Sequence, residues 1–127
     1  MKELNLVIQA EPPNVNNYVK HTRSGRHYKT KAAHSWLEEV GIAVCAWKLS
    51  CDPYNEEVLV PGKAHEVTYV VYQGFKSKGD VDNYAKCILD ALVDCGVLKS
   101  DASIVSLHAH KLRDRNKPRT EIKVRAL

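Results

Sequence analysis

Hydrophobic residues recur along the first half of the chain with periods that predict a strand, a helix and a second strand. Residues 4–9 alternate between apolar and polar side chains, which is typical of a strand. After Thr30, apolar residues recur at helical spacing as far as Leu49, so we expect a helix there that Thr30 caps. Residues 65–72 are rich in β-branched and aromatic side chains and predict the second strand.

A second helix is expected after a polar, glycine-bounded loop over residues 73–79. Asp80 is of a residue type that caps helices, and we place it as the N-cap of a helix from Val81 to about Cys95. Gly96 then ends this helix, because glycine readily adopts the left-handed conformation that closes a helix.

Two further strands are expected over residues 103–112 and 119–125, joined by a turn. The order β-α-β-α-β-β predicts an α/β fold of the α+β type, in which two main helices pack on a mixed β-sheet. No repeat or linker divides the chain, so we expect one domain over residues 1–127.

Two segments are predicted to be connections. Residues 14–29 are polar, basic and aromatic, and too irregular to predict an element; loops of that length are usually functional or mobile. Residues 51–63 contain two prolines and a glycine and are also expected to form a connection.

Composition places the chain among ordinary globular proteins. It has 44% hydrophobic and 27% charged residues, so wholesale disorder is excluded. The N-terminus lacks the plan of a signal peptide and no apolar run approaches about 18 residues, so we expect a cytoplasmic protein without a membrane span. The four cysteines show no CxxC pair or zinc-finger spacing and are interpreted as reduced thiols that fill the core: Cys45, Cys51, Cys87 and Cys95.

The net charge of +4 is unevenly distributed. Residues 18–31 hold five basic residues and no acid, and residues 111–125 hold seven basic residues and two acids. Basic margins around an acidic middle suit a nuclease, which attracts phosphates and also holds a divalent cation. The same pattern equally fits the solvated faces of a helix and a hairpin.

Asp80 and Asp82 form the most informative pair in the sequence, because they stand one residue apart where a loop becomes a helix. At about 4 Å and an effective dielectric near 20, two carboxylates repel by roughly 4 kcal/mol. Such a pair normally persists by binding a proton, a basic side chain or a metal, and oxygen ligands favour Mg²⁺ or Mn²⁺. Asp101 lies in a turn beyond Gly96, and we expect the reversed chain to bring it near the head of the helix.

A purely structural interpretation also fits this helix. Asp80 would then be only a cap, and Asp82 an acid that the helix dipole favours in the first turn. Asp82, Lys86, Asp90 and Asp94 fall at i, i+4 intervals that suit an exposed salt-bridge ladder. The spacing alone leaves both interpretations open, and Asp101 favours the metal site.

The segment over residues 80–102 resembles the core of the RusA family of Holliday junction resolvases. The shared pattern is D-x-D-N-x-x-K, then a D-A-L stretch, a glycine and a turn ending in aspartate. The entry Pro12-Pro13-Asn14-Val15-Asn16, followed by Gly25-Arg26 and Tyr28, resembles the family's P-P-S-x-N entry and basic loop. This chain departs from the pattern at Asn14, where the family usually has serine, and at Ser100, where the family often has a second aspartate.

The resemblance implies a Mg²⁺-dependent endodeoxyribonuclease, with Mn²⁺ as a possible substitute and no other cofactor. Its substrate would be four-way DNA junctions, resolved by paired symmetric nicks in recombination and repair, in the nucleoid of a bacterium or from a phage. Asp80, Asp82 and Asp101 would be catalytic metal ligands, and Lys86 would stabilise charge in the transition state. Asp90 also matches the pattern and is interpreted as structural.

The two-fold symmetry of a four-way junction implies a homodimer, with the first helix or an exposed sheet edge as the interface. Tyr18, His27 and Tyr28 are candidates for stacking on exposed bases. The residues predicted to contact DNA are Asn16, Lys20, Arg23, Arg26, Lys29, Lys78, Arg113 and Arg115.

Two other functions are open to the sequence. The first is a non-catalytic protein that binds branched DNA, in which the aspartates serve as caps. The second is an unrelated Mg²⁺-dependent phosphohydrolase of nucleotides, which the absence of a glycine-rich phosphate loop disfavours. Repelling acids beside a phosphate partner bring no advantage to a pure binder, so the nuclease is favoured.

Overall fold

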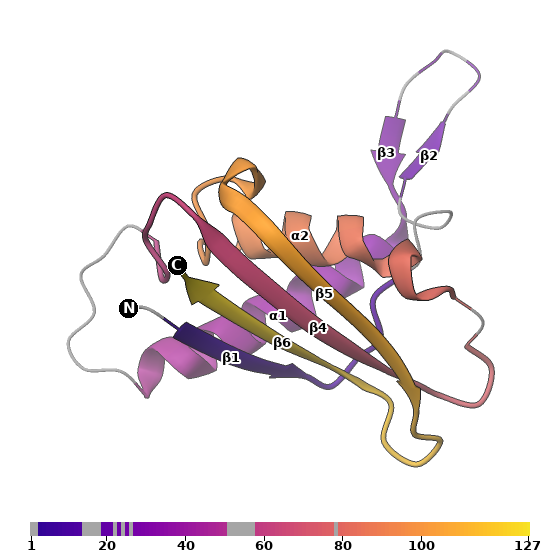
Figure 1. Ribbon diagram of the computed structural model, residues 1–127. Coiled ribbons are helices and arrows are strands. Elements are labelled where there is room, and N and C mark those ends of the chain that lie inside the picture. Colours follow the sequence, from indigo (N-terminus) through magenta and orange to yellow (C-terminus); the bar gives the residue numbers. More distant parts are fainter. Residues whose placement is uncertain are drawn as a thin grey trace.

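The computed structural model describes residues 3–13, 19–21, 23, 25, 27–50, 58–77 and 79–127. Four strands form one mixed sheet in the order β1-β6-β4-β5 (Figure 1). They are β1 (Glu3–Ile8), β4 (His65–Gln73), β5 (Ile104–Arg113) and β6 (Arg119–Ala126). β4 pairs with β5 in parallel and with β6 in antiparallel register, and β6 is antiparallel to β1. β1 and β5 are therefore the two edges of this sheet.

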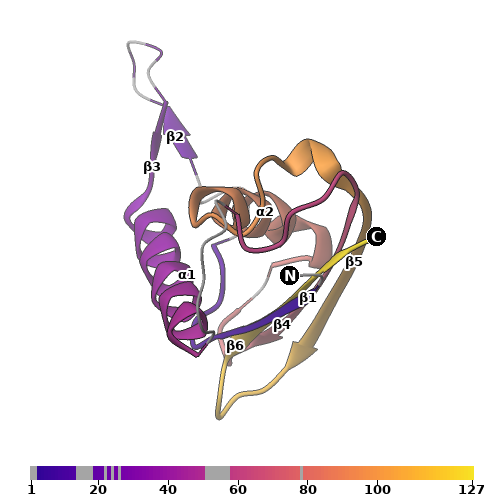
Figure 2. The same ribbon diagram turned by 90° about the vertical axis from the view of Figure 1, so that its left-hand side faces the viewer.

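Two main helices cover one face of the sheet and leave the other face open (Figures 1 and 2). They are α1 (Lys31–Leu49) and α2 (Ala85–Asp94), and two short 3₁₀ helices accompany α2: η2 (Val81–Tyr84) and η3 (Asp101–Ser103). Thr30 caps α1 as expected, since its Oγ1 accepts a hydrogen bond from the Ala33 N–H at 3.2 Å. The expected mixed sheet with two helices in the order β-α-β-α-β-β is confirmed.

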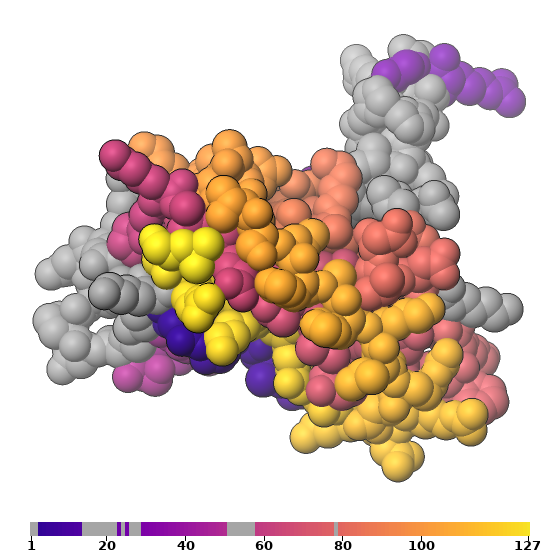
Figure 3. All heavy atoms as spheres, viewed as in Figure 1, coloured from indigo at the N-terminus to yellow at the C-terminus, as the bar shows by residue number. Residues whose placement is uncertain are grey.

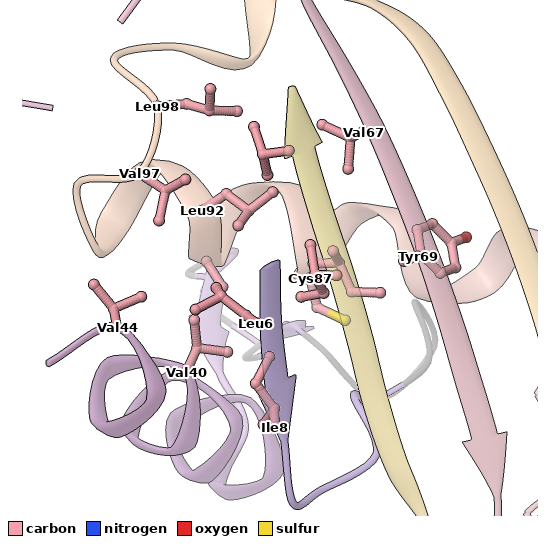
Figure 4. Packing of buried hydrophobic residues seen from close by; sticks show 14 of the residues in the cluster. Leu6, Ile8, Val40, Val44, Val67, Tyr69, Cys87, Leu92, Val97 and Leu98 are labelled. Atoms are coloured by element: carbon pink, nitrogen blue, oxygen red, sulfur yellow. The ribbon is translucent and has the colours of Figure 1, made fainter. Parts of the chain in front are cut away.

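The core lies between the sheet and the helices. Along β4, every second residue from His65 to Gln73 is buried, as the period-two geometry of a strand requires. Val40 on α1 and Leu92 on α2 are fully buried and approach the sheet from the two helices (Figure 4). Burial of apolar surface at this single interface accounts for the placement of both helices on one face.

Three expectations need correction. The segment over residues 14–29 is not without structure, because its described part holds a two-stranded antiparallel sheet of β2 (Val19–His21) and β3 (His27–Lys29). These strands project from the body of the molecule (Figure 1). They are polar and three residues long, so no apolar alternation signals them. The helix expected from Val81 begins as 3₁₀ helix and becomes α-helical at Ala85.

The third correction concerns the thiols. Cys87 is buried in the core as expected and Cys95 is half-buried and packs against it, but Cys45 is exposed; Cys51 lies outside the described residues. Burial raises the pKa of the Cys87 thiol from its usual 9.0 to about 12. No helix in the described part of the chain is long and apolar enough to cross a membrane.

Candidate active site

The acidic segment, residues 79–82, is held at two backbone positions by buried side chains of β4. The Tyr69 hydroxyl donates a 2.6 Å hydrogen bond to the carbonyl oxygen of Val81, and Gln73 Nε2 donates one of 2.8 Å to that of Gly79. Tyr69 is fully buried and Gln73 is 4% exposed. The carbonyl groups on both sides of Asp80 are therefore fixed to the central part of the sheet.

Gly79 is required by a close approach of the Tyr84 ring. Gln73 Nε2 also donates a 2.7 Å hydrogen bond to the Tyr84 hydroxyl oxygen, which draws that ring against Gly79. A Cβ atom at Gly79 would lie 2.3 Å from the hydroxyl oxygen of Tyr84 and 2.5 Å from its Cζ, so only glycine fits without a shift. The glycine before Asp80 thus serves packing beneath the acidic segment.

The two carboxylates of this segment point to solvent. Asp80 occupies the cap position of η2, but its side chain makes no capping hydrogen bond and is 77% exposed. Lys111 Nζ lies 4.0 Å from Asp80 Oδ1 and donates a 3.4 Å hydrogen bond to the Gly79 carbonyl. Asp82 is exposed in the first turn of η2. Burial, and to a lesser extent the negative charge of Asp82, raises the pKa of Tyr69 to about 12. Asp80 therefore stands at the N-cap position as predicted, but its side chain makes no capping bond.

Asp101 does not return to the head of the helix within one chain. It lines a hollow of about 180 Å³ with Asp90 and Asp94, beside the second half of α2. Asp101 begins η3, which directly precedes β5, whereas Lys111, the cation beside Asp80, stands seven residues after the first residue of that strand. Seven strand residues span more than about 20 Å. Among the described residues, no group of three or more His, Cys, Asp and Glu side chains lies where it could hold one metal ion.

The turn that carries Asp101 is anchored by a buried histidine. His65 is 2% exposed; its Nε2 donates to the Val60 carbonyl oxygen at 2.8 Å, and its Nδ1 lies 2.7 Å from Ser103 Oγ. Ser100 Oγ accepts a 3.1 Å hydrogen bond from the N–H of Ala102 and caps η3. Asp101 is thus an exposed carboxylate on a fixed turn.

Lys86 forms part of the salt-bridge ladder that the spacing allows. Its Nζ lies 3.5 Å from Asp90 Oδ2, and the lysine side chain is 58% exposed. An exposed pair of this kind contributes little to stability, so it leaves the ammonium group available for other contacts. Asp94, at the end of the same helix, lies 3.4 Å from Lys29 Nζ at the end of β3.

The structure places some of the expected DNA-contacting residues. Arg23 and Arg115 are exposed, and Lys29 joins the hairpin to α2 through Asp94. The Arg113 guanidinium donates to the carbonyl oxygens of Gly74 and Ser77, so it holds a loop of the protein itself. Asn16, Arg26 and Lys78 lie outside the described residues, as do Tyr18 and the side chains of Lys20, His27 and Tyr28.

Sequence reasoning missed the residues that hold the site. Tyr69 and Gln73 occupy buried positions of β4, and a polar amide at such a position needs a hydrogen-bond partner. A polar side chain at a position that the alternation of β4 predicts to be buried is therefore a signal for such a residue. Lys111 carried no comparable signal, because a lysine near the end of an edge strand is ordinary.

Exposed carboxylates on a backbone fixed by buried hydrogen bonds, within a basic protein, fit the class of metal-dependent nucleases. Comparison with known families gives the same class: a family model described as "Endodeoxyribonuclease RusA" matches residues 9–125. The chain is also 26% identical over 126 residues to "Crossover junction endodeoxyribonuclease RusA" of Aquifex aeolicus (strain VF5), which covers 98% of this chain and 93% of that protein. The chain belongs to the RusA endodeoxyribonuclease family, an enzyme family of Holliday junction resolvases whose members depend on metal ions.

Proposed function

We propose that this chain is a Mg²⁺-dependent endodeoxyribonuclease that resolves four-way DNA junctions by paired symmetric nicks, in recombination and repair. The observation that carries the proposal is the acidic segment, whose exposed carboxylates stand on a backbone that Tyr69 and Gln73 fix to β4. A site that is rigid before substrate arrives holds its ligands in reactive geometry without a further ordering cost.

Asp80, Asp82 and Asp101 are the proposed metal ligands. Their carboxylate oxygens are hard donors, which suit Mg²⁺ and allow Mn²⁺ to substitute. When bound, such a cation lowers the pKa of a water ligand and offsets charge on the phosphate. Lys86, one helical turn beyond Asp82, is proposed to approach the reacting phosphate and stabilise its developing negative charge.

A homodimer joined along β5 explains how Asp101 contributes. β5 is an edge strand, and Val105, Leu107 and Leu112 on it are 66%, 43% and 54% exposed. Its atoms lie along the surface in the space-filling view (Figure 3). An unpaired edge with exposed apolar side chains is a template for pairing with a second copy.

Antiparallel pairing of two β5 strands brings the start of each strand beside the end of the other. The end of β5 carries Lys111, the neighbour of Asp80, and the start follows η3, whose first residue is Asp101. Asp101 of the partner subunit would then approach Asp80 and Asp82, and each dimer would hold two composite sites. Two sites related by a two-fold axis match two opposed strands of a four-way junction.

The proposal is tested with a synthetic four-way junction, with and without Mg²⁺. We expect paired symmetric nicks with the metal and binding alone without it. Asp82→Asn should abolish cutting and preserve or tighten binding, because one negative charge facing DNA is removed. Glu38→Gln, an exposed acid on α1, is the matched control and should cut normally.

Three results would count against the proposal. Normal cutting by Asp82→Asn would show that the site is elsewhere. Equal cutting of linear duplex and junction would keep the nuclease but reject junction resolution. Binding of the junction without cutting in either Mg²⁺ or Mn²⁺ would support the non-catalytic binder instead.

A further inference from the structure

Phe75 is an exposed aromatic side chain in the loop that leads from β4 to the acidic segment. The residue is 72% exposed, and Lys76 beside it is exposed as well. A single exposed apolar residue is common on protein surfaces and needs no explanation by itself. The surroundings of Phe75, however, differ from those of an incidental surface residue in anchoring and in charge.

The loop around Phe75 is anchored on both sides of the ring. The Arg113 guanidinium donates to the carbonyl oxygens of Gly74 and Ser77, and the Ser77 hydroxyl donates to a carboxylate oxygen of Glu11. At Gly74 an added Cβ would lie only 3.0 Å from Pro118 Cγ, so the loop is also packed against the β5–β6 turn. The backbone on either side of Phe75 is therefore held by contacts with Arg113, Glu11 and Pro118.

One basic side chain lies over the ring, and two more stand in the adjacent segments of the chain. The guanidinium carbon of Arg115 lies 5.1 Å from the ring centroid, within the range of a cation–π contact. Lys76 follows Phe75 in the loop and Lys117 lies in the β5–β6 turn, and both are exposed. The charge of Asp114 in the same turn is offset by Arg119, whose Nη1 lies 2.9 Å from Asp114 Oδ2.

An exposed π surface with a guanidinium group over it suits a ligand that has both an aromatic face and negative charge. A nucleotide in DNA has both, in its base and its phosphate, and base stacking on aromatic side chains is tolerant of sequence. Simple anions would make no use of the phenyl ring. An apolar protein surface would have to desolvate the surrounding cations.

We propose that Phe75 is a stacking platform for a base that is unstacked at the branch point of the DNA junction, with Arg115 held over the same ring toward the flanking phosphates. This proposal rests on the proposed function. Ser77 is bonded to Arg113 of β5, and Gly79, directly before Asp80, is bonded to Gln73 of β4. Phe75 and the carboxylates are thus anchored on two neighbouring strands, which couples recognition of the branch point to the position of the cut.

The test uses the full-length protein without Mg²⁺, so that binding is read independently of cutting. Phe75→Ala should weaken binding to a four-way junction by about 5- to 100-fold and change binding to linear duplex by less than about two-fold. A junction with 2-aminopurine at the branch point should become more fluorescent with wild-type protein and not with Phe75→Ala. Phe75→Trp should restore both signals, whereas Phe75→Leu should not.

Val7→Ala is the matched control, because Val7 is an exposed apolar residue on the far edge strand β1. Unchanged junction binding by Phe75→Ala, an equal loss on linear duplex, or full rescue by Phe75→Leu would each overturn the stacking role. Failure of the wild-type protein to cut with Mg²⁺ would instead overturn the proposed function, and the binding and fluorescence results would still decide the role of Phe75.

Discussion

The hydroxyl of Tyr69 donates a 2.6 Å hydrogen bond to the carbonyl oxygen of Val81, the residue between Asp80 and Asp82. The donor stands on the central part of a strand, and the acceptor lies in the segment that carries two exposed carboxylates. Burial raises the pKa of Tyr69 to about 12, so the hydroxyl keeps its proton and remains a donor at any physiological pH. The bond therefore ties the geometry of the candidate site to the most buried layer of the fold.

Tyr69→Phe is expected to raise the Mg²⁺ concentration needed for cutting and to lower the free energy of unfolding only slightly. Loss of the hydroxyl leaves the Val81 carbonyl without this donor and should lower the free energy of unfolding by about 1 kcal/mol. Because Asp80 and Asp82 are then less well placed, the Mg²⁺ concentration for half-maximal junction cutting should rise while junction binding without metal stays the same. Metal titrations of cutting and a binding assay check this.

Tyr72→Phe is the matched control, since Tyr72 is on the same strand but faces the open side, with Arg119 over its ring at 3.8 Å. An unchanged Mg²⁺ midpoint in Tyr69→Phe would show that this hydrogen bond has no part in placing the carboxylates.

Gly79→Ala is expected to destabilise the protein by about 1–3 kcal/mol, because the new methyl group would overlap the Tyr84 hydroxyl and force a shift. Gly41→Ala provides the contrast. Gly41 lies inside α1 with open space around a built Cβ, so the substitution should stabilise by about 0.5–1 kcal/mol through helix propensity alone. Urea unfolding of both variants measures the difference, and equal effects would refute the close-packing explanation.

The fold was predictable from the sequence where an element has an apolar period long enough to read. The nine residues of β4 and the nineteen of α1 each present a regular buried face, and their positions were correct to within about two residues. The pair β2–β3 was missed because its three-residue strands are joined mainly by backbone hydrogen bonds, which side-chain patterns do not reveal.

The candidate site was predictable in composition but not in geometry. Asp80 and Asp82 stand at the head of a helix as expected, whereas Asp101 lies beside the second half of α2. This helix rises by about 15 Å over its ten residues. The chain that follows does not run back along it, because the N–H groups of Val97 and Leu98 are bonded to the Leu92 carbonyl oxygen near its C-terminal end. The motif identifies the acids, but this local turn, which the spacing does not reveal, keeps them apart within one chain.

High pH is expected to lower the free energy of unfolding because two buried groups, the Tyr69 hydroxyl and the Cys87 thiol, resist ionisation. The pKa of Tyr69 is raised from 10.0 to about 12 and that of Cys87 from 9.0 to about 12, in both cases mainly by burial. Between about pH 9 and 12 the unfolded chain therefore loses protons that the native state keeps. Stability is fully present below about pH 9 and falls as the pH rises through this window.

Urea unfolding at pH 8, 10 and 11 checks this expectation. The decline should be less steep in Tyr69→Phe than in the wild type, and Tyr72→Phe should behave as the wild type. Parallel slopes in all three proteins would mean that the buried hydroxyl does not contribute.

Complementation between two inactive variants tests whether the site is shared between subunits. Asp82→Asn and Asp101→Asn homodimers should each fail to cut, because every site lacks one ligand. In a mixed dimer with composite sites, one site receives both substitutions and the other receives none. Random mixing makes half of the dimers mixed, so about a quarter of the wild-type sites should return. These dimers should nick one strand of a junction and not two.

If each site were instead built within one chain, both sites of a mixed dimer would remain defective and no cutting would return. Asp82→Asn mixed with Asp80→Asn provides the comparison: both proposed ligands come from the same subunit, so each site of a mixed dimer lacks one ligand and no cutting should return.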